Sequence, residues 1–192
     1  FGSSHFSSGL GSTLFSSGLQ QYCRMAKAAL LLLAVAVVVV GHYATGGGES
    51  LWAGVATGLA GITCGCLTFG SFVDCPFLMQ LRNKPELIKA IFPVWWPYGK
   101  DLMVPLIGLT TLSTAGAAYL SEKKQWLAST GLTAFILVYT GAFMLKTISP
   151  LREPDTKPEQ IAGLVSSFNT LHHVRTVIAL FSLANALYLF QG

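Results

Sequence analysis

The chain has 192 residues and carries only 12 Lys or Arg and 8 Asp or Glu, a charged fraction of 10% where soluble domains hold about 25%. Hydrophobic residues make up 52% of the sequence, and the mean hydropathy is +0.58. These values argue against a water-soluble domain and place the chain in a lipid bilayer.

The first 24 residues form a Ser/Gly-rich segment that has no acidic residue and repeats the sequence FSSGL at Phe6–Leu10 and Phe15–Leu19. This composition fits a flexible linker, and it also resembles what remains of an organellar transit sequence, although arginine is scarce before Arg24. Such a segment buries too little apolar surface to order itself. We therefore expect an extended tail over residues 1–24, held by neighbouring subunits, and a transmembrane bundle over residues 25–192.

Beyond the N-terminal segment, five stretches of 17 to 24 residues contain no Asp, Glu, Lys or Arg. A helix needs about 20 residues to cross a hydrocarbon core, and no alternating pattern suggests a barrel. The first stretch is the doubtful one, because its apolar part is short and ends in glycines. We expect an all-α, polytopic membrane helix bundle of four to five transmembrane helices, with spans at about 28–45, 51–73, 102–121, 125–146 and 171–190.

The basic residues favour the five-span arrangement. If all five stretches cross, ten basic residues face one side and only Lys123 and Lys124 face the other. If the first stretch does not cross, the division becomes eight against four. The positive-inside rule then places the N-terminus and both long loops on the inner side. Acidic residues lie among the basic ones in both long loops, so the net charge of +4 does not indicate a nucleic acid partner.

Small residues mark one face of the second stretch. Gly54, Gly58, Gly61 and Gly65 recur at helical spacing and let another backbone approach closely. Two interpretations fit this stripe, packing within the chain's own bundle and contact with another chain. Asn185 is the one amide well inside a span, where an interhelical hydrogen bond is commoner than catalysis.

The segment between Asp74 and Asp101 predicts a short surface helix from Pro85 to Phe92, followed by an aromatic run. Trp95, Trp96 and Tyr98 suit the headgroup zone as anchors, and the alternative is a platform for a quinone or another aromatic ligand.

A second loop, Lys146 to Leu171, contains a capping-box pattern from Thr156 to Glu159, which predicts a helix that starts near Lys157. His172, His173 and Arg175 follow where the last span meets the membrane. Adjacent histidines point about 100° apart on a helix, so they do not share one metal. Interfacial anchoring to lipid is one interpretation, and a base at His172 with Arg175 attracting an anionic group is the other.

The remaining motifs predict neither a metal site nor a cofactor. The four cysteines, Cys23, Cys64, Cys66 and Cys75, lack zinc or iron–sulfur spacing and read as small buried residues. Nucleotide-binding loops and spaced histidine pairs are missing. A bound phospholipid is the ligand we expect.

From Gly54 to about Leu189 the sequence resembles the anthrone oxygenase-like family of small four-span membrane proteins. Three runs carry the resemblance: SFVDCPFLMQL (Ser71–Leu81), FPVWWPYGKDLMVPL (Phe92–Leu106) and FNTLHHVRTVIAL (Phe168–Leu180). It implies four spans and, in catalytic members, oxidation of polycyclic anthrones without a recognised cofactor. His172 and Arg175 match the shared pattern, and the apolar segment before Glu49 is an addition.

Two hypotheses follow. The first is a non-catalytic accessory subunit of a multi-subunit organellar complex, such as the respiratory chain or ATP synthase, that contacts other subunits and lipids. It would lie in the mitochondrial inner membrane with its N-terminus in the matrix, or alternatively in a plastid membrane. The second is a membrane-bound oxygenase that acts on a hydrophobic aromatic substrate, with His172 as the base. A small transporter is disfavoured, because we expect no charge deep in a span.

Overall fold

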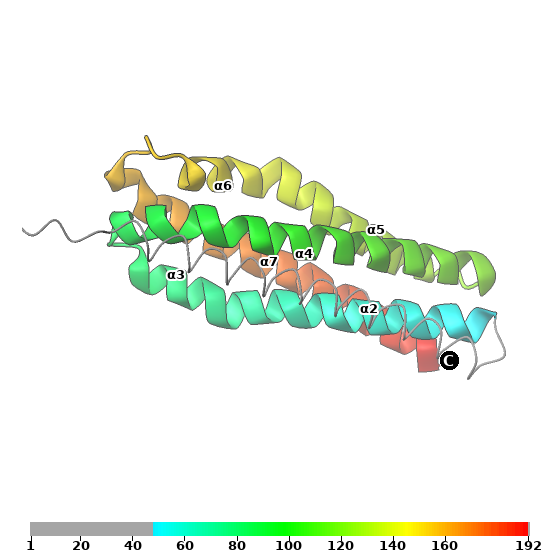
Figure 1. The fold of residues 1–192 in the computed structure, drawn as a ribbon. Helices are drawn as coiled ribbons and strands as arrows, with labels where there is room; N and C mark the ends of the chain where they lie inside the picture. Colours follow the sequence, from blue (N-terminus) through cyan, green and yellow to red (C-terminus); the bar gives the residue numbers. More distant parts are fainter. Residues whose placement is uncertain (1–47, 192) are drawn as a thin grey trace, which may run out of the picture. The chain divides into compact units, whose positions relative to one another are not determined.

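The computed structural model describes residues 48–191, which form an all-helical bundle without strands. Four continuous helical segments are long and apolar enough to cross a membrane: Glu49–Leu81, Pro85–Leu120, Trp126–Arg152 and Pro158–Gln191. The expected fold, a polytopic helical membrane bundle, is confirmed (Figure 1). The expected span at 28–45 and the tail lie outside the described residues.

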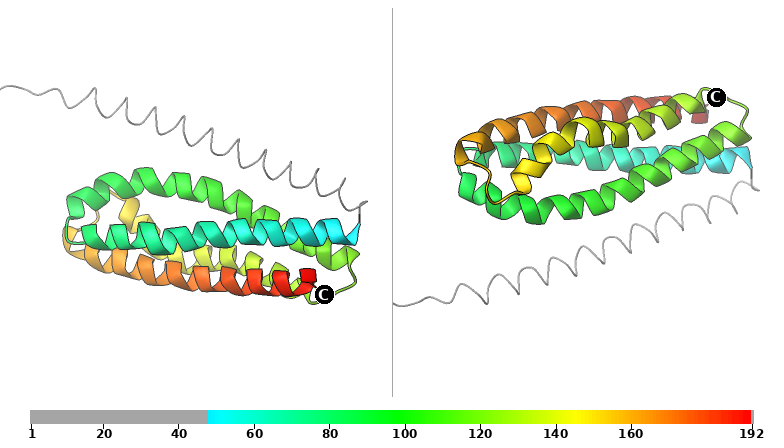
Figure 2. Two further views of the ribbon diagram at one scale, coloured as in Figure 1. Left: turned by 90° about the horizontal axis from the view of Figure 1, so that it is seen from below. Right: turned by 90° about the horizontal axis from the view of Figure 1, so that it is seen from above.

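Each long segment runs antiparallel to the next. The first comprises α2 (Glu49–Phe69), a π-helical turn η1 (Gly70–Asp74) and α3 (Cys75–Leu81), and the second is α4 (Pro85–Leu120). The third comprises α5 (Trp126–Tyr139), a π-helical turn η2 (Thr140–Met144) and α6 (Leu145–Arg152), and α7 (Pro158–Gln191) is the fourth. α2 packs against α4 and α7, and α5 packs against the same two helices, so the four segments form a closed ring (Figure 2).

The two short connections at one end of the bundle are residues 82–84 and 153–157, and residues 121–125 form the connection at the other end (Figure 1). We refer to these as the two-turn end and the one-turn end. The start of α2 and the end of α7 lie at the one-turn end.

The expected loop between Asp74 and Asp101 is wrong. The helix that begins at Pro85 does not stop at Phe92 but continues to Leu120, and Pro93, Pro97 and Pro105 lie inside it. A proline removes one backbone hydrogen bond, which neighbouring helices can compensate within a membrane bundle. The aromatic run is therefore part of a wall of the bundle.

The helix expected near Lys157 is present as α7, which starts at Pro158 and continues without a break to Gln191. Its capping differs from the expected box, because the Thr156 hydroxyl donates a hydrogen bond to the Pro150 carbonyl over 2.6 Å. Thr156 thus ties the end of α6 to the turn.

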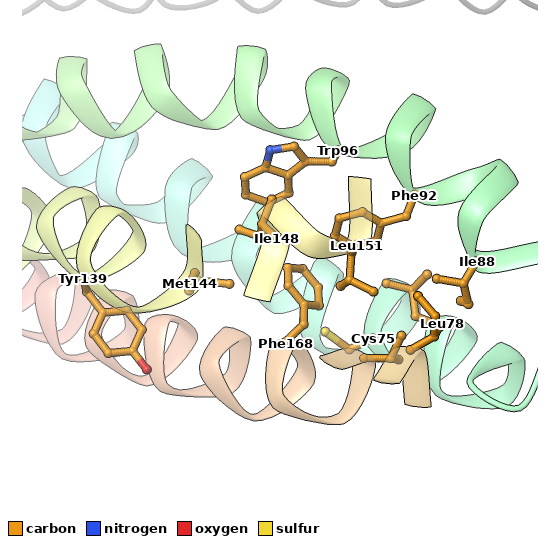
Figure 3. Close-up of a cluster of buried hydrophobic side chains, with 12 residues drawn as sticks. Cys75, Leu78, Ile88, Phe92, Trp96, Tyr139, Met144, Ile148, Leu151 and Phe168 are labelled. Carbon is orange, nitrogen blue, oxygen red and sulfur yellow. The ribbon is translucent and has the colours of Figure 1, made fainter. Parts of the chain in front are cut away.

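Large apolar side chains cover much of the outer surface, as a lipid environment requires, and they include Phe69, Phe72, Leu112, Tyr119, Val138, Phe181 and Tyr188. Inside the two-turn end is a cluster of twelve buried residues, which we call the aromatic core (Figure 3). Its members come from all four segments: Cys75, Leu78, Ile88, Phe92, Trp96, Tyr139, Met144, Ile148, Leu151, Ile161, Val165 and Phe168.

Candidate functional site

Polar side chains gather inside the bundle next to the aromatic core. The Nδ1 atom of His172 lies 3.1 Å from the Ser71 hydroxyl, which is itself 2.7 Å from the Thr176 hydroxyl. Thr176 also donates to the backbone carbonyl of Leu67 over 3.1 Å. All of these side chains are buried, and His172 is only 4% exposed. The chain of contacts fixes the imidazole, so that Nδ1 faces Ser71 and Nε2 lies on the side of Gly70.

Both π-helical turns lie at the level of this cluster, and both contact α7. Within η1, Gly70 lies against the imidazole of His172. A Cβ atom at Gly70 would come within 2.8 Å of both Cε1 and Nε2 of that ring, which is closer than such atoms approach in proteins. Short π-helical turns inside an α-helix are frequent at functional sites. The glycine and the π-helical turn together make room for the buried histidine.

Arg175 follows His172 by three residues on α7 and is 6% exposed. Its Nε atom is buried and has no hydrogen-bond partner among the described residues. A buried guanidinium nitrogen without an acceptor is costly, and a ligand, an ion or a water molecule that accepts its hydrogen bond would offset that cost.

Gly70, His172 and Arg175 line a cavity of about 90 Å³. The apolar side chains of Trp95, Trp96 and Met103 form part of its lining. Two glycines, Gly70 and Gly99, and the hydroxyl-bearing Thr140 also line it. The residues at the cavity that can carry a charge are Cys66, Asp74, Lys100, His172 and Arg175. An apolar cavity with a few convergent polar groups is the usual form of a small-molecule site.

Aromatic rings close the cavity towards the two-turn end. Phe92 stacks parallel to Trp96 with ring centroids 6.3 Å apart. Phe168 meets Trp95, Trp96 and Phe92 edge to face at 6.1, 6.2 and 5.5 Å. The phenyl ring of Phe168 also lies 5.8 Å from the imidazole of His172. The aromatic core and the polar cluster are thus directly continuous.

The structure brings together four of the predicted site residues, since Trp95, Trp96, His172 and Arg175 all line the cavity. Tyr98 and His173 are not among its lining residues, and His173 is exposed. Trp96, His172 and Arg175 face the interior, which favours a role inside the bundle over anchoring. Lipid contact by the more exposed Trp95, Tyr98 and His173 stays a prediction.

Sequence reasoning missed Ser71, Asp74 and Thr176, and it expected no charge at depth. The structure instead buries Arg175 and lines the cavity with Asp74. A signal was present, because Ser71 and Asp74 belong to the SFVDC run that carries part of the family resemblance. Gly70 was missed because nothing in the sequence shows which side chain a glycine faces.

The predicted glycine stripe divides into two pairs. A Cβ atom at Gly54 or Gly61 would lie 3.6 Å from Phe190 or 3.9 Å from Leu183, both on α7, whereas one at Gly58 or Gly65 would have no atom within 4 Å. The Asn185 amide donates to the Ser129 hydroxyl over 2.8 Å and to the Gln125 carbonyl over 3.2 Å, which joins α7 to α5 and its preceding turn. A packing role for Gly58 and Gly65 stays a prediction.

Across residues 48–191, no three His, Cys, Asp or Glu side chains lie close enough together to hold a metal ion.

The arrangement defines a class of protein: a small helical membrane protein with an aromatic-lined internal cavity that holds a histidine and an arginine. Residues 92–184, just under half of the chain, match the family model described as Anthrone oxygenase. This match confirms the resemblance, and this part of the chain is similar to the anthrone oxygenase family. It includes Trp95, Trp96, His172 and Arg175 but not Ser71 or Asp74. No curated protein and no solved structure matches the chain.

Proposed function

We propose that the protein is a membrane-bound oxygenase that acts, without a cofactor, on a polycyclic aromatic ketone of the anthrone type. The observation that carries this proposal is the buried Arg175, which lines an aromatic-walled cavity together with His172 and whose Nε atom has no hydrogen-bond partner among the described residues. The tryptophan rings suit a flat aromatic ligand, and the guanidinium suits its oxygen atom.

In this proposal, His172 removes a proton from the methylene carbon between the two aromatic rings. Ser71 and Thr176 hold the imidazole by its Nδ1 side, so the ring accepts the proton at Nε2. Negative charge then collects on the ketone oxygen as an enolate. Arg175 stabilises this oxygen, because a fixed charge in a water-poor site needs no reorganisation during the reaction.

Molecular oxygen is the second substrate. It adds to the carbon that lost the proton, and the resulting peroxide anion takes that proton back from His172 to form a hydroperoxide. The hydroperoxide then loses water to leave a carbonyl group. Each turnover consumes one O₂, one of whose atoms enters the ring system while the other leaves as water. The CH₂ group loses four electrons and O₂ gains four, so the reaction requires no external reductant.

The test is the rate of O₂ uptake by the purified full chain in lipid nanodiscs, with 1,8-dihydroxyanthrone as the probe. We expect the wild type to exceed the spontaneous rate and the His172→Ala variant to fall to that rate. The matched control is His173→Ala, which removes an exposed imidazole next to the cavity histidine. Wild-type uptake at the rate of protein-free nanodiscs, or equal rates for the two variants, would refute the proposal.

A second candidate is the accessory-subunit role in an organellar membrane complex, which Gly58 and Gly65 favour. These glycines leave a smooth outer face on α2 where another helix could approach closely. In this role the chain would contact neighbouring subunits and phospholipids of the mitochondrial inner membrane, with its N-terminus in the matrix, or of a plastid membrane. Co-purification with redox or ATPase subunits, weakened by deletion of residues 1–21, is the expected result. Recovery of the full chain from mild detergent only as a free monomer would contradict it.

A further inference from the structure

The cavity is closed along the axis of the bundle. On the side of the two-turn end it meets the aromatic core, in which Phe92 and Phe168 are almost fully buried. On the opposite side, Leu67, Ile107 and Ile136 belong to a second buried cluster. Because packed side chains fill both directions, a ligand that followed the axis would have to separate a core.

The cavity is open beside α4. Two of its lining residues on that helix are exposed on the outside of the bundle, Lys100 with 54% of its side chain exposed and Val104 at 48%. Gly99 adds no side chain, and a Cβ atom there would have no atom within 4 Å. On this side, the cavity therefore faces the lipid that surrounds the outer face of α4.

The size of the cavity points the same way. Sites that enclose a drug-sized ligand measure about 300 to 1,000 Å³, so 90 Å³ accommodates only one end of a three-ring molecule. The edge of the middle ring that carries the oxygen atom is held inside, because the buried Arg175 lies there. The rest of the molecule would then lie on the open side of the cavity, beside Gly99.

We infer that the ligand reaches the cavity sideways from the bilayer, through an opening bounded by Val104 and Lys100 on α4. Only the ligand class, a lipophilic aromatic molecule with an ionisable oxygen, rests on the proposed function. Lys100, whose Nζ atom lies 3.7 Å from Oδ1 of Asp101, captures the ligand's oxygen atom at the mouth of the cavity. Arg175 then holds that oxygen atom inside. Val104 is a residue of the route, whereas Gly99 and Arg175 belong to the site.

A route and a site differ in their kinetics. A bulky residue in the route slows association and dissociation by the same factor and leaves Kd unchanged, whereas one in the site raises Kd. The probe is 1,8-dihydroxyanthraquinone, a non-reacting analogue, and stopped-flow quenching of tryptophan fluorescence reports its binding to the full chain in nanodiscs. Trp95 and Trp96 at the cavity supply the signal.

We expect Val104→Phe to slow both rates at least fivefold at constant Kd. Its control is Leu112→Phe, also exposed on α4 but not at the cavity, which should leave both rates unchanged. Gly99→Leu should raise Kd about tenfold or more. Its control, Gly108→Leu, places a side chain on the same helix at another position where a Cβ atom meets nothing within 4 Å, and should leave Kd unchanged.

Equal kinetics for Val104→Phe and Leu112→Phe would overturn the inferred route, as would wild-type protein that does not bind the probe. These outcomes are separable from failure of the proposed oxygenase. Binding with the expected pattern but without O₂ uptake would refute only the enzyme. Uptake with normal kinetics in Val104→Phe would refute only the route.

Discussion

The two halves of the bundle are built from different side chains. At the two-turn end, large rings and aliphatic chains pack around a buried histidine and arginine, and two π-helical turns interrupt the helices. At the one-turn end, the helices approach on small residues, and the buried cluster consists mainly of alanines: Ala53, Ala56, Ala60, Ala117 and Ala186, with Trp126 and Leu189.

Hydrogen bonding differs in the same sense. Hydroxyl groups join the helices towards the one-turn end, as in the pairs Thr63 with Thr110 at 2.8 Å and Thr111 with Thr133 at 3.1 Å. The buried side-chain atoms without a partner among the described residues, Asn169 Oδ1 and Arg175 Nε, both lie on α7 in the half that contains the cavity. Towards the one-turn end, paired polar groups hold the helices together. In the half that contains the cavity, two buried polar atoms have no partner among the described residues and can meet a ligand.

The largest expected effect comes from Arg175, whose buried Nε atom has no hydrogen-bond partner among the described residues. Arg175→Met should weaken binding of 1,8-dihydroxyanthraquinone about 100-fold, because the ligand's oxygen loses its charged partner. The same change should not lower the thermal unfolding temperature, since removal of an unpaired buried charge removes its desolvation penalty. Titration of tryptophan fluorescence and thermal unfolding in nanodiscs measure the two effects.

Arg175→Lys keeps the charge but not the fork of donors, and it should bind with intermediate affinity. A large loss of unfolding temperature in Arg175→Met would mean that the arginine holds the bundle together, and the contrast between the halves would fail.

Substitution of one tightly packed glycine in each half tests the difference between the halves directly. A Cβ atom at Gly70 would lie 2.8 Å from the His172 ring, and one at Gly116 would lie 2.8 Å from Cε3 of Trp52. Gly70→Ala should lower O₂ uptake at least tenfold, because it displaces the imidazole. Gly116→Ala should leave turnover unchanged and cost about 1 kcal/mol of stability or less, because the partly exposed Trp52 can move outward. Similar activity in the two variants would contradict this division.

Ser71 gives a smaller effect, because it acts through His172. Ser71→Ala removes the hydroxyl that contacts both the imidazole and Thr176. We expect kcat to fall about tenfold while KM changes little, since the ligand itself is not touched. Steady-state O₂ uptake at several probe concentrations measures both constants, and recovery of kcat in Ser71→Thr would show that the hydroxyl is responsible. A change confined to KM would argue against a positioning role.

The smallest effect is expected in the hydroxyl-linked half. Thr110→Val removes the bond to Thr63, and interhelical hydrogen bonds in membranes contribute on average about 0.6 kcal/mol. Stability measured by reversible unfolding in mixed micelles should fall by about that amount, with turnover unchanged. A loss of turnover would show that the two halves are coupled.

Sequence alone predicted the fold class well, because uncharged stretches of bilayer length leave helices as the available structure. It misjudged residues 74–101, since three prolines and a run of aromatics indicate a loop where only the neighbouring helices make a helix possible. For the site, it identified Trp95, Trp96, His172 and Arg175 by residue type and family pattern. It did not find that Arg175 lies inside the bundle or that Gly70 and Ser71 face His172, because these contacts join residues about 100 positions apart.

The prolines of α4 have a mechanical consequence. Pro93, Pro97 and Pro105 have no N–H group, so three turns of this helix each lack one of the bonds that resist bending. The prolines fall on either side of Gly99 and Lys100, on the helix that separates the cavity from the lipid. The part of α4 beside the cavity therefore resists bending less than a helix without prolines, and it is where a molecule larger than the cavity could be admitted without unpacking the other three segments.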